Sequence, residues 1–262
     1  MVLPARRRVV AVLISLAMSA CASSEQAALR EPDDSSRMRV ASVAEANGQP
    51  GVALSLYGIE AGNRPDDPQA QARYAAALRR AGGVAQADEV LNQALGRMPG
   101  APALLVQSGQ IRLLAGDPEA LDLFERALAA DPDDADALSG KAMALDLAGR
   151  HAEALRWHAA AATAAPDDLP IANNHALSML LAGHPEEAIS ILAPLAQRPD
   201  APARVANNLA LAYAAAGHAA TARTVVQDPA GARRIERYGQ LLQQEQTRMP
   251  SSQAYSSPSL EP

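Results

Sequence analysis

The 262-residue sequence contains one cysteine, one tryptophan and one phenylalanine, and aromatic residues make up 3% of it. A single cysteine excludes both an intramolecular disulfide and a metal site built from several cysteines. The scarcity of aromatic residues disfavours a β-sandwich, whose strands are enriched in aromatic and β-branched residues. The hydrophobic residues, 48% of the chain, are mostly Ala and Leu and therefore favour closely packed helices.

The chain also lacks an excess of basic charge. Its formal net charge is −6, which argues against general nucleic-acid binding, because a nucleic-acid-binding surface is basic. It contains no phosphate-binding loop, nucleophile elbow or HExxH motif, and no Ser or Thr has an orienting His nearby. We therefore predict a protein that is not an enzyme and has no cofactor and no metal site.

The N-terminal segment predicts an export signal. Arginines at residues 6–8 precede an apolar stretch at 9–17, which is shorter than the roughly 20 residues that a membrane-spanning helix needs. The small residues before Cys21 resemble the bacterial lipoprotein box, so we predict a signal peptide at 1–20 and lipidation of Cys21. An ordinary signal peptide that is cut after an alanine is the alternative.

Lipidation would anchor the chain firmly, because each methylene of a buried acyl chain contributes about 0.8 kcal/mol. Ala22 stands where an Asp would resemble the inner-membrane retention signal of enteric bacteria, so we expect the periplasmic face of the outer membrane. Residues 21–33 are mostly polar and are predicted to form a flexible tether after the lipidated cysteine.

A spacing of 33 or 34 residues recurs in four kinds of residue. Six glycines keep it: Gly48, Gly82, Gly116, Gly149, Gly183 and Gly217. Each is followed four or five residues later by an alanine: Ala53, Ala87, Ala120, Ala154, Ala188 and Ala222. A larger side chain comes four residues after each alanine: Tyr57, Leu91, Phe124, His158, Leu192 and Val226. Prolines close most units: Pro65, Pro99, Pro132, Pro166 and Pro199.

This repeat predicts units of two short amphipathic helices, A and B. The glycine would end helix A in the left-handed conformation, and the alanine would let helix B approach helix A. The proline would end helix B, since it cannot lie inside a helix without breaking a hydrogen bond. Because one helix pair cannot bury its apolar face alone, neighbouring pairs must stack.

Such units resemble the tetratricopeptide repeat, and residues 135–168 agree with it best. The resemblance implies an all-α solenoid of about six units: 34–67, 68–101, 102–134, 135–168, 169–202 and 203 onward, the whole spanning 34–228. The sequence departs from the family at the hallmark Trp of helix A, where Leu105 and Leu138 stand, and Trp157 lies on helix B instead. Residues 229–247 are predicted to form a C-terminal capping helix, and 248–262 a disordered tail.

The five histidines are not expected to form a metal site. His151, His184 and His218 lie in the turns of successive units, where we expect them to be exposed and about one repeat apart. His158 and His175 occupy packing positions on a B and an A helix. No two of them have the spacing of a ligand pair on one helix face.

Paired acids follow two of the closing prolines, at Asp133-Asp134 and Asp167-Asp168. Carboxylates at this position accept hydrogen bonds from the free N–H groups of a helix N-terminus. We predict helix capping, and a catalytic acid–base pair is the less favoured alternative.

In tetratricopeptide solenoids the A helices line a concave groove, which is where we expect a protein or peptide partner to bind. The predicted groove residues are Arg39, Arg73, Gln107, Gln110, Met143, Asn173, Asn174, Leu177, Arg204, Asn207, Asn208 and Leu211. The amides of Asn173 and Asn207 are suited to bind a peptide backbone. The alternative is that one Asn of each pair is structural and bonds to the neighbouring unit.

The lipoprotein box, the repeats, the phrase at 207–212 (NNLALA) and the closing helix together resemble the TadD lipoproteins of the tight-adherence (Flp/Tad) pilus system. The resemblance extends over about residues 15–245. It implies an outer-membrane lipoprotein that assists assembly of the pilus or its secretin. A general periplasmic adaptor in an envelope or polysaccharide export complex is the alternative.

Overall fold

The computed structural model describes residues 34–226 and 229–248, and all thirteen regular elements in these ranges are α-helices. The all-α fold class is therefore confirmed. None of the described helices is both long enough and apolar enough to span a membrane. The predicted signal peptide, Cys21, the tether and the C-terminal tail lie outside the described residues.

The chain divides into two compact units, residues 1–62 and 63–262. In the first unit, α2 (Asp34–Ala46) and α3 (Pro50–Asn63) are joined by a turn at Gly48, whose φ is 70°. The Tyr57 hydroxyl donates a hydrogen bond to Glu45 Oε2 at 3.3 Å, which ties α3 to α2. This hairpin corresponds to the first predicted repeat.

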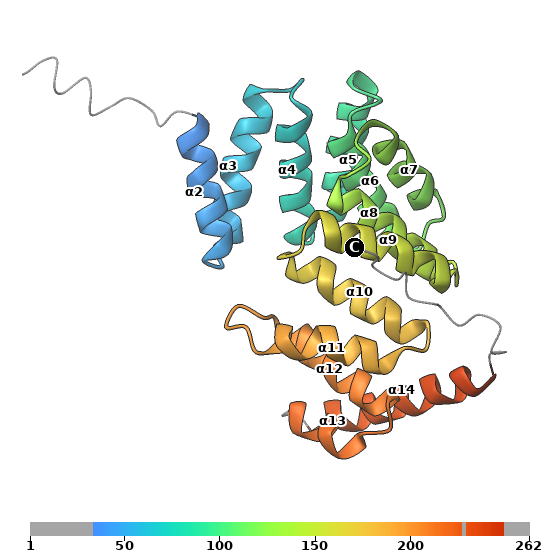
Figure 1. The fold of residues 1–262 in the computed structure, drawn as a ribbon. Coiled ribbons are helices and arrows are strands. Elements are labelled where there is room, and N and C mark those ends of the chain that lie inside the picture. Colours follow the sequence, from blue (N-terminus) through green and yellow to red (C-terminus); the bar gives the residue numbers. More distant parts are fainter. Residues whose placement is uncertain (1–33, 227–228, 249–262) are drawn as a thin grey trace, which may run out of the picture. The chain divides into compact units, whose positions relative to one another are not determined.

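The second unit contains five further helix pairs and a final helix (Figure 1). Its A helices are α4 (Pro68–Arg80), α6 (Pro102–Leu114), α8 (Ala135–Leu147), α10 (Leu169–Leu181) and α12 (Ala203–Ala215). Its B helices are α5 (Val84–Arg97), α7 (Glu119–Ala130), α9 (His151–Ala164), α11 (Pro185–Ala196) and α13 (Ala219–Val225).

Each A helix of this unit packs against its own B helix and against the A helix of the next pair. The B helices α5, α7, α9 and α11 also contact the A helix that follows them. Consecutive A helices therefore lie side by side and form one surface, which we call the A face. The tetratricopeptide-type α-solenoid predicted from the repeat period is the architecture found.

The last helix, α14 (Pro229–Arg248), packs against α12 and α13, as expected of a cap. The Gln243 side chain donates to the carbonyl oxygens of Ala214 and Ala215, at 3.0 and 2.9 Å. These carbonyls lie at the end of α12, where helix geometry leaves them without intrahelical partners. Gly239 makes this close approach possible, because a β-carbon there would lie 2.5 Å from that of Ala214.

The glycine turns have the predicted conformation. All six repeat glycines have positive φ, between 68° and 89°. At Gly149, for example, its own N–H bonds to the Asp146 carbonyl and the Arg150 N–H bonds to the Leu145 carbonyl, at 3.0 and 2.9 Å. This arrangement ends α8 and directs the chain into α9.

The small and capping residues are also where the repeat predicts them. The alanines of the repeat are all buried (Ala53, Ala87, Ala120, Ala154, Ala188 and Ala222). Asp134 and Asp168 are N-caps, and each accepts a backbone hydrogen bond at 2.8 Å. The capping function predicted for the acid pairs is therefore confirmed for the second member of each, whereas Asp133 and Asp167 are exposed.

Phe124 of α7 is the largest fully buried side chain of the second unit. Its ring lies against Gly109 of α6 and Gly140 of α8, so one side chain is enclosed by three helices. A β-carbon at Gly109 would lie 2.8 Å from the ring, and one at Gly140 would overlap it. These two glycines are therefore required for packing, although neither has a positive φ.

We expect Gly140→Ala to lower the free energy of unfolding by about 1–3 kcal/mol, because overpacking strains a core that has no room to adjust. Alanine favours a helix more than glycine does, so helix propensity alone predicts the opposite sign. Urea denaturation followed by circular dichroism measures the difference.

Gly96→Ala is the matched control, since Gly96 lies in α5 and an added β-carbon there meets no atom within 4 Å. It is expected to raise the free energy of unfolding by about 0.4–1 kcal/mol. A stabilising effect of both substitutions would contradict the packing argument.

Candidate functional site

The A face contains a pocket of about 350 Å³, which we call the leucine pocket. Three consecutive A helices, α6, α8 and α10, supply its walls, and one residue comes from the B helix α9. The lining residues are Leu113, Leu114, Met143, Asp146, Leu147, His158, Asn174, Leu177, Ser178 and Leu181. A site shared among three repeats exists only when the repeats are stacked.

The apolar rim of this pocket follows from the repeat. Leu114, Leu147 and Leu181 are each the last residue of an A helix, two residues before the turn glycine. Leu114 and Leu147 are 65% and 67% exposed, which is unusual for such large apolar side chains in a folded unit. Their exposure is not required by the core, and a contiguous apolar surface is typical of an interaction site.

Asp146 is the acidic residue among the lining residues, and its side chain is 11% exposed. Its Oδ1 accepts hydrogen bonds from His151 Nδ1 at 2.8 Å and from Ser178 Oγ at 3.1 Å. Its Oδ2 accepts from His158 Nε2 at 3.1 Å. One carboxylate thus connects α8, α9 and α10.

His158 is completely buried. Because its Nε2–H donates to Asp146, its Nδ1 is the free position, and this buried atom has no hydrogen-bond partner among the described residues. The ring stacks on that of His175, with centroids 6.1 Å apart and planes at 14°.

The pKa of Asp146 and the pKa of His175 are both shifted, but for different reasons. Burial alone would raise the pKa of Asp146, but the hydrogen bonds from His158, His151 and Ser178 hold the pKa below its usual value. The carboxylate is therefore ionised at neutral pH. Burial, and then the positive charge that His158 would carry, lower the pKa of His175 to about 4, so His175 is neutral.

The structure places three of the predicted groove residues, Met143, Asn174 and Leu177, in the leucine pocket. Asn174 Nδ2 donates to Met143 Sδ at 3.3 Å, which links α10 to α8. Farther along the A face, Gln110 Oε1 accepts a hydrogen bond from Arg79 at 2.6 Å. The buried Gln107 Oε1 has no partner among the described residues.

The other predicted groove residues are spread out. Arg73, Arg204 and Asn207 are exposed outside the pocket, and Leu211 packs against the core between α10 and α12. Arg39 lies on α2 of the first unit, where it bonds to Ser36 at 2.8 Å.

The structure disagrees with the expectation that Asn173 binds a peptide backbone. It is only 3% exposed, and its Oδ1 accepts a hydrogen bond from Asn208 Nδ2 at 3.0 Å. The pair joins α10 to α12, so the structural alternative for Asn173 is the correct one. Asn207 is exposed and remains accessible to a partner.

The expectation for His151 is wrong. This side chain is 23% exposed and is bonded to Asp146 rather than free in a turn. The expectation for His184 is also wrong, since its side chain is 24% exposed, with Nδ1 3.7 Å from Glu187. His218 is exposed as expected. In the described part of the chain no three His, Cys, Asp or Glu side chains form a possible metal site.

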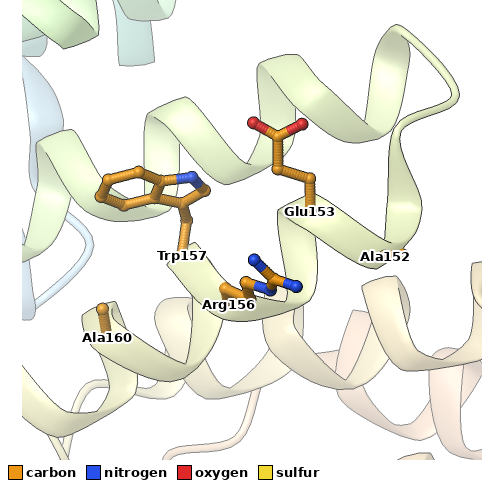
Figure 2. A pocket seen from close by; sticks show the side chains of 5 residues that line it. All are labelled: Ala152, Glu153, Arg156, Trp157 and Ala160. Atoms are coloured by element: carbon orange, nitrogen blue, oxygen red, sulfur yellow. The ribbon is translucent and has the colours of Figure 1, made fainter. Parts of the chain in front are cut away.

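A second pocket, of about 540 Å³, lies along one side of α9 and is lined by Ala152, Glu153, Arg156, Trp157 and Ala160 (Figure 2). The Lys141 ammonium lies 3.9 Å from the centroid of the Trp157 ring and 3.0 Å from Glu125. A cation above the ring face stabilises this position of the indole.

Comparison with known proteins agrees with the architecture. Residues 123–156 match the tetratricopeptide repeat family. A tetratricopeptide repeat protein from Parabacteroides merdae has 14% identity and a TM-score of 0.56, over 87% of this chain and 92% of its own. A thermophilic tetratricopeptide repeat protein of Thermus thermophilus has 22% identity and a TM-score of 0.59, over 67% and 98%. At these identities the likeness concerns the fold. A search of the curated proteins finds no match.

Of the pocket leucines, sequence reasoning found Leu177 but not the rim leucines Leu114, Leu147 and Leu181, and it did not find Asp146. The recurrence of Leu114, Leu147 and Leu181 at intervals of 33 and 34 residues was a signal that could have found the rim. Asp146 stands where the neighbouring repeats have Leu113 and Leu180, and this break in an apolar column was also readable. The hydrogen bonds that make it a site come from separate helices and have no sequence pattern.

Asp146→Asn is expected to lower the free energy of unfolding by about 1–3 kcal/mol, because the buried His158 and Ser178 lose a charged acceptor. We expect the same substitution at Asp136, which lies on the same helix, to have the opposite effect on the free energy of unfolding. Asp136 is exposed, but desolvation by the surrounding protein and the nearby Asp134 and Asp168 raise its pKa, so its charge is less favourable in the fold than in the unfolded chain. Asp136→Asn is therefore expected to maintain or increase stability. Paired urea denaturation curves at pH 7 measure both, and equal losses would contradict the assignment.

The lowered pKa of His175 predicts a pH dependence of stability. In the unfolded chain this residue takes up its proton near 6.5, but in the folded chain only near pH 4. Between these values the unfolded state binds about one proton more, so stability should fall as the pH falls through this window. The melting temperature of the wild type should therefore decline more steeply from pH 6.5 to 4 than that of His175→Gln. Identical slopes would show that His175 is not the cause.

Proposed function

We propose that the protein is a lipid-anchored scaffold whose A face binds another polypeptide. The observation that carries this proposal is the leucine pocket, which is mainly apolar, open and assembled from three repeats. Such a surface costs solubility unless something covers it. Stacked helix pairs offer an extended surface on which a polypeptide can lie across several repeats.

A non-catalytic role fits the polar groups of the site. Ser178 and His158 bond to Asp146 and not to each other, so in this network no His is placed to take the proton of the Ser178 hydroxyl. A nucleophilic site needs the base to contact the nucleophile and the acid to orient the base. The arrangement here fixes three helices rather than preparing a reaction.

The place of action that we propose is the periplasmic face of the outer membrane, with the anchor on Cys21. The support is the sequence at residues 6–21, with its basic start, short apolar run and small residues before the cysteine. A tether at 21–33 would then separate the membrane from the first helix pair.

The process that we propose is assembly of a Flp/Tad-type pilus or its secretin. The support is the resemblance of residues 15–245 to the TadD lipoproteins. An anchored surface that binds another polypeptide is suited to such an assembly role. The alternative is a general adaptor of an envelope or polysaccharide export complex. Such an adaptor would have the same anchor and the same A face, but it would not assist secretin assembly.

Cys21→Ser tests the anchor and the process together. The serine variant should take up no labelled palmitate and should move from the outer-membrane fraction to the soluble periplasmic fraction. Because the binding surface would then be detached from the membrane, the yield of assembled secretin in the outer membrane should also fall. Fractionation, palmitate labelling and immunoblotting of secretin multimers measure these outcomes.

Ser23→Ala is the matched control, because it changes a neighbouring tether residue and leaves the cysteine in place. It should be labelled, fractionate and support secretin assembly as the wild type does. A lost anchor with normal secretin would favour the general adaptor, and a Cys21→Ser protein that still carries palmitate would contradict lipidation at this residue.

A further inference from the structure

We propose that the leucine pocket binds one lysine or arginine side chain of the partner polypeptide, with its aliphatic stem against the leucines and its cationic end at Asp146. This inference rests on the proposed function, because it assumes that a polypeptide lies on the A face. It goes further by assigning the chemical class of the residue that the pocket accepts.

The walls of the pocket suit the stem of such a side chain. Five leucines and Met143 supply most of the lining, and they come from α6, α8 and α10. Lysine and arginine bury their methylene groups along apolar surface while the charged end reaches a polar group. A volume of about 350 Å³ is ample for one such side chain.

The carboxylate of Asp146 forms the polar end of the pocket. Asp146 is ionised, and its three hydrogen-bond donors are the hydroxyl of Ser178 and the rings of His151 and His158. None of the residues described as lining the pocket is a lysine or an arginine. Asp146 therefore has structural donors but no lysine or arginine counter-ion within this lining.

This charge discriminates among possible occupants. A purely apolar side chain would remove the remaining water from the carboxylate and offer nothing in exchange, which is unfavourable. An acidic side chain would be repelled. A cationic group replaces the water with a charge-assisted hydrogen bond, which is among the stronger kinds.

Asn174 adds a second acceptor at the pocket. Its Nδ2 is directed to Met143 Sδ, so its Oδ1 is the group left to accept a hydrogen bond from a ligand. An ammonium group has three donors and no acceptor, and a guanidinium has five donors. Two oxygen acceptors beside an apolar wall thus match a cation on an aliphatic stem. The net charge of −6 on the whole chain also favours a basic partner segment.

Small probes that share one stem test the proposal on the full chain. We would titrate methyl-labelled protein at pH 7 with n-pentylammonium, n-pentanol and pentanoate and follow the leucine and methionine methyl signals by NMR. Pentylammonium should shift the pocket methyls saturably and bind about ten-fold or more tightly than pentanol, because it adds a charge-assisted bond. Pentanol binding as well as pentylammonium, or no saturable shift by pentylammonium, would overturn the proposal.

Two charge variants sharpen the test. Asp146→Asn should abolish the preference for pentylammonium over pentanol, whereas Asp136→Asn, which removes a charge from the same helix outside the pocket, should retain it. An unchanged preference in Asp146→Asn would overturn the assignment. Leu147→Ser, at an exposed position, should weaken both pentylammonium and pentanol and does not depend on the Asp146 network. If Leu147→Ser bound both probes as tightly as the wild type, the probes would bind outside the leucine pocket and the proposal would be overturned.

The outcome of the probe experiment does not depend on the outcome of the secretin experiment. The NMR preference depends only on the pocket, and secretin assembly depends only on the anchored scaffold. A pentanol preference alongside normal secretin assembly would overturn the cation pocket and leave the scaffold function in place. A pentylammonium preference alongside normal secretin in the Cys21→Ser strain would support the pocket and count against the pilus role.

Discussion

The left-handed turn between helix A and helix B is the constraint on which the second unit depends. Because its glycine ends the A helix with φ near +70° to +90°, the B helix can start only two or three residues later. The alanine that follows is buried in every pair, and its small side chain permits close packing there. Because every pair has this same turn, successive pairs can stack in register and their A helices meet along one face. The leucine pocket is a consequence of this order, since it uses the ends of three A helices.

Most of this scaffold was predictable because its causes are local. The turn conformation at Gly149 and the cap at Asp134 each depend on a few neighbouring residues, and both follow from residue type and period. The start of the cap at Pro229 was also predictable, because a proline interrupts the sixth unit and fits the first turn of a new helix.

The site was much less predictable, because it depends on which side of each helix faces the neighbour. Asn173 and Asn174 are adjacent, yet a rotation of about 100° between them places one in the interface and the other in the pocket. His151 was expected in an exposed turn, but the aspartate that it binds is at the end of the preceding helix. A single sequence gives the period of the repeat, whereas hydrogen bonds such as Ser178 to Asp146 arise between repeats.

The ring of Phe124, enclosed by glycines of two successive A helices, has a consequence for how the solenoid loses its structure. In a linear array, each repeat is held only by its neighbours, so its cooperativity is set interface by interface. The Phe124 ring is enclosed by α6, α7 and α8, so it couples the third repeat to the fourth. Separating the third repeat from the fourth would expose this ring to water, so these two repeats are expected to unfold together.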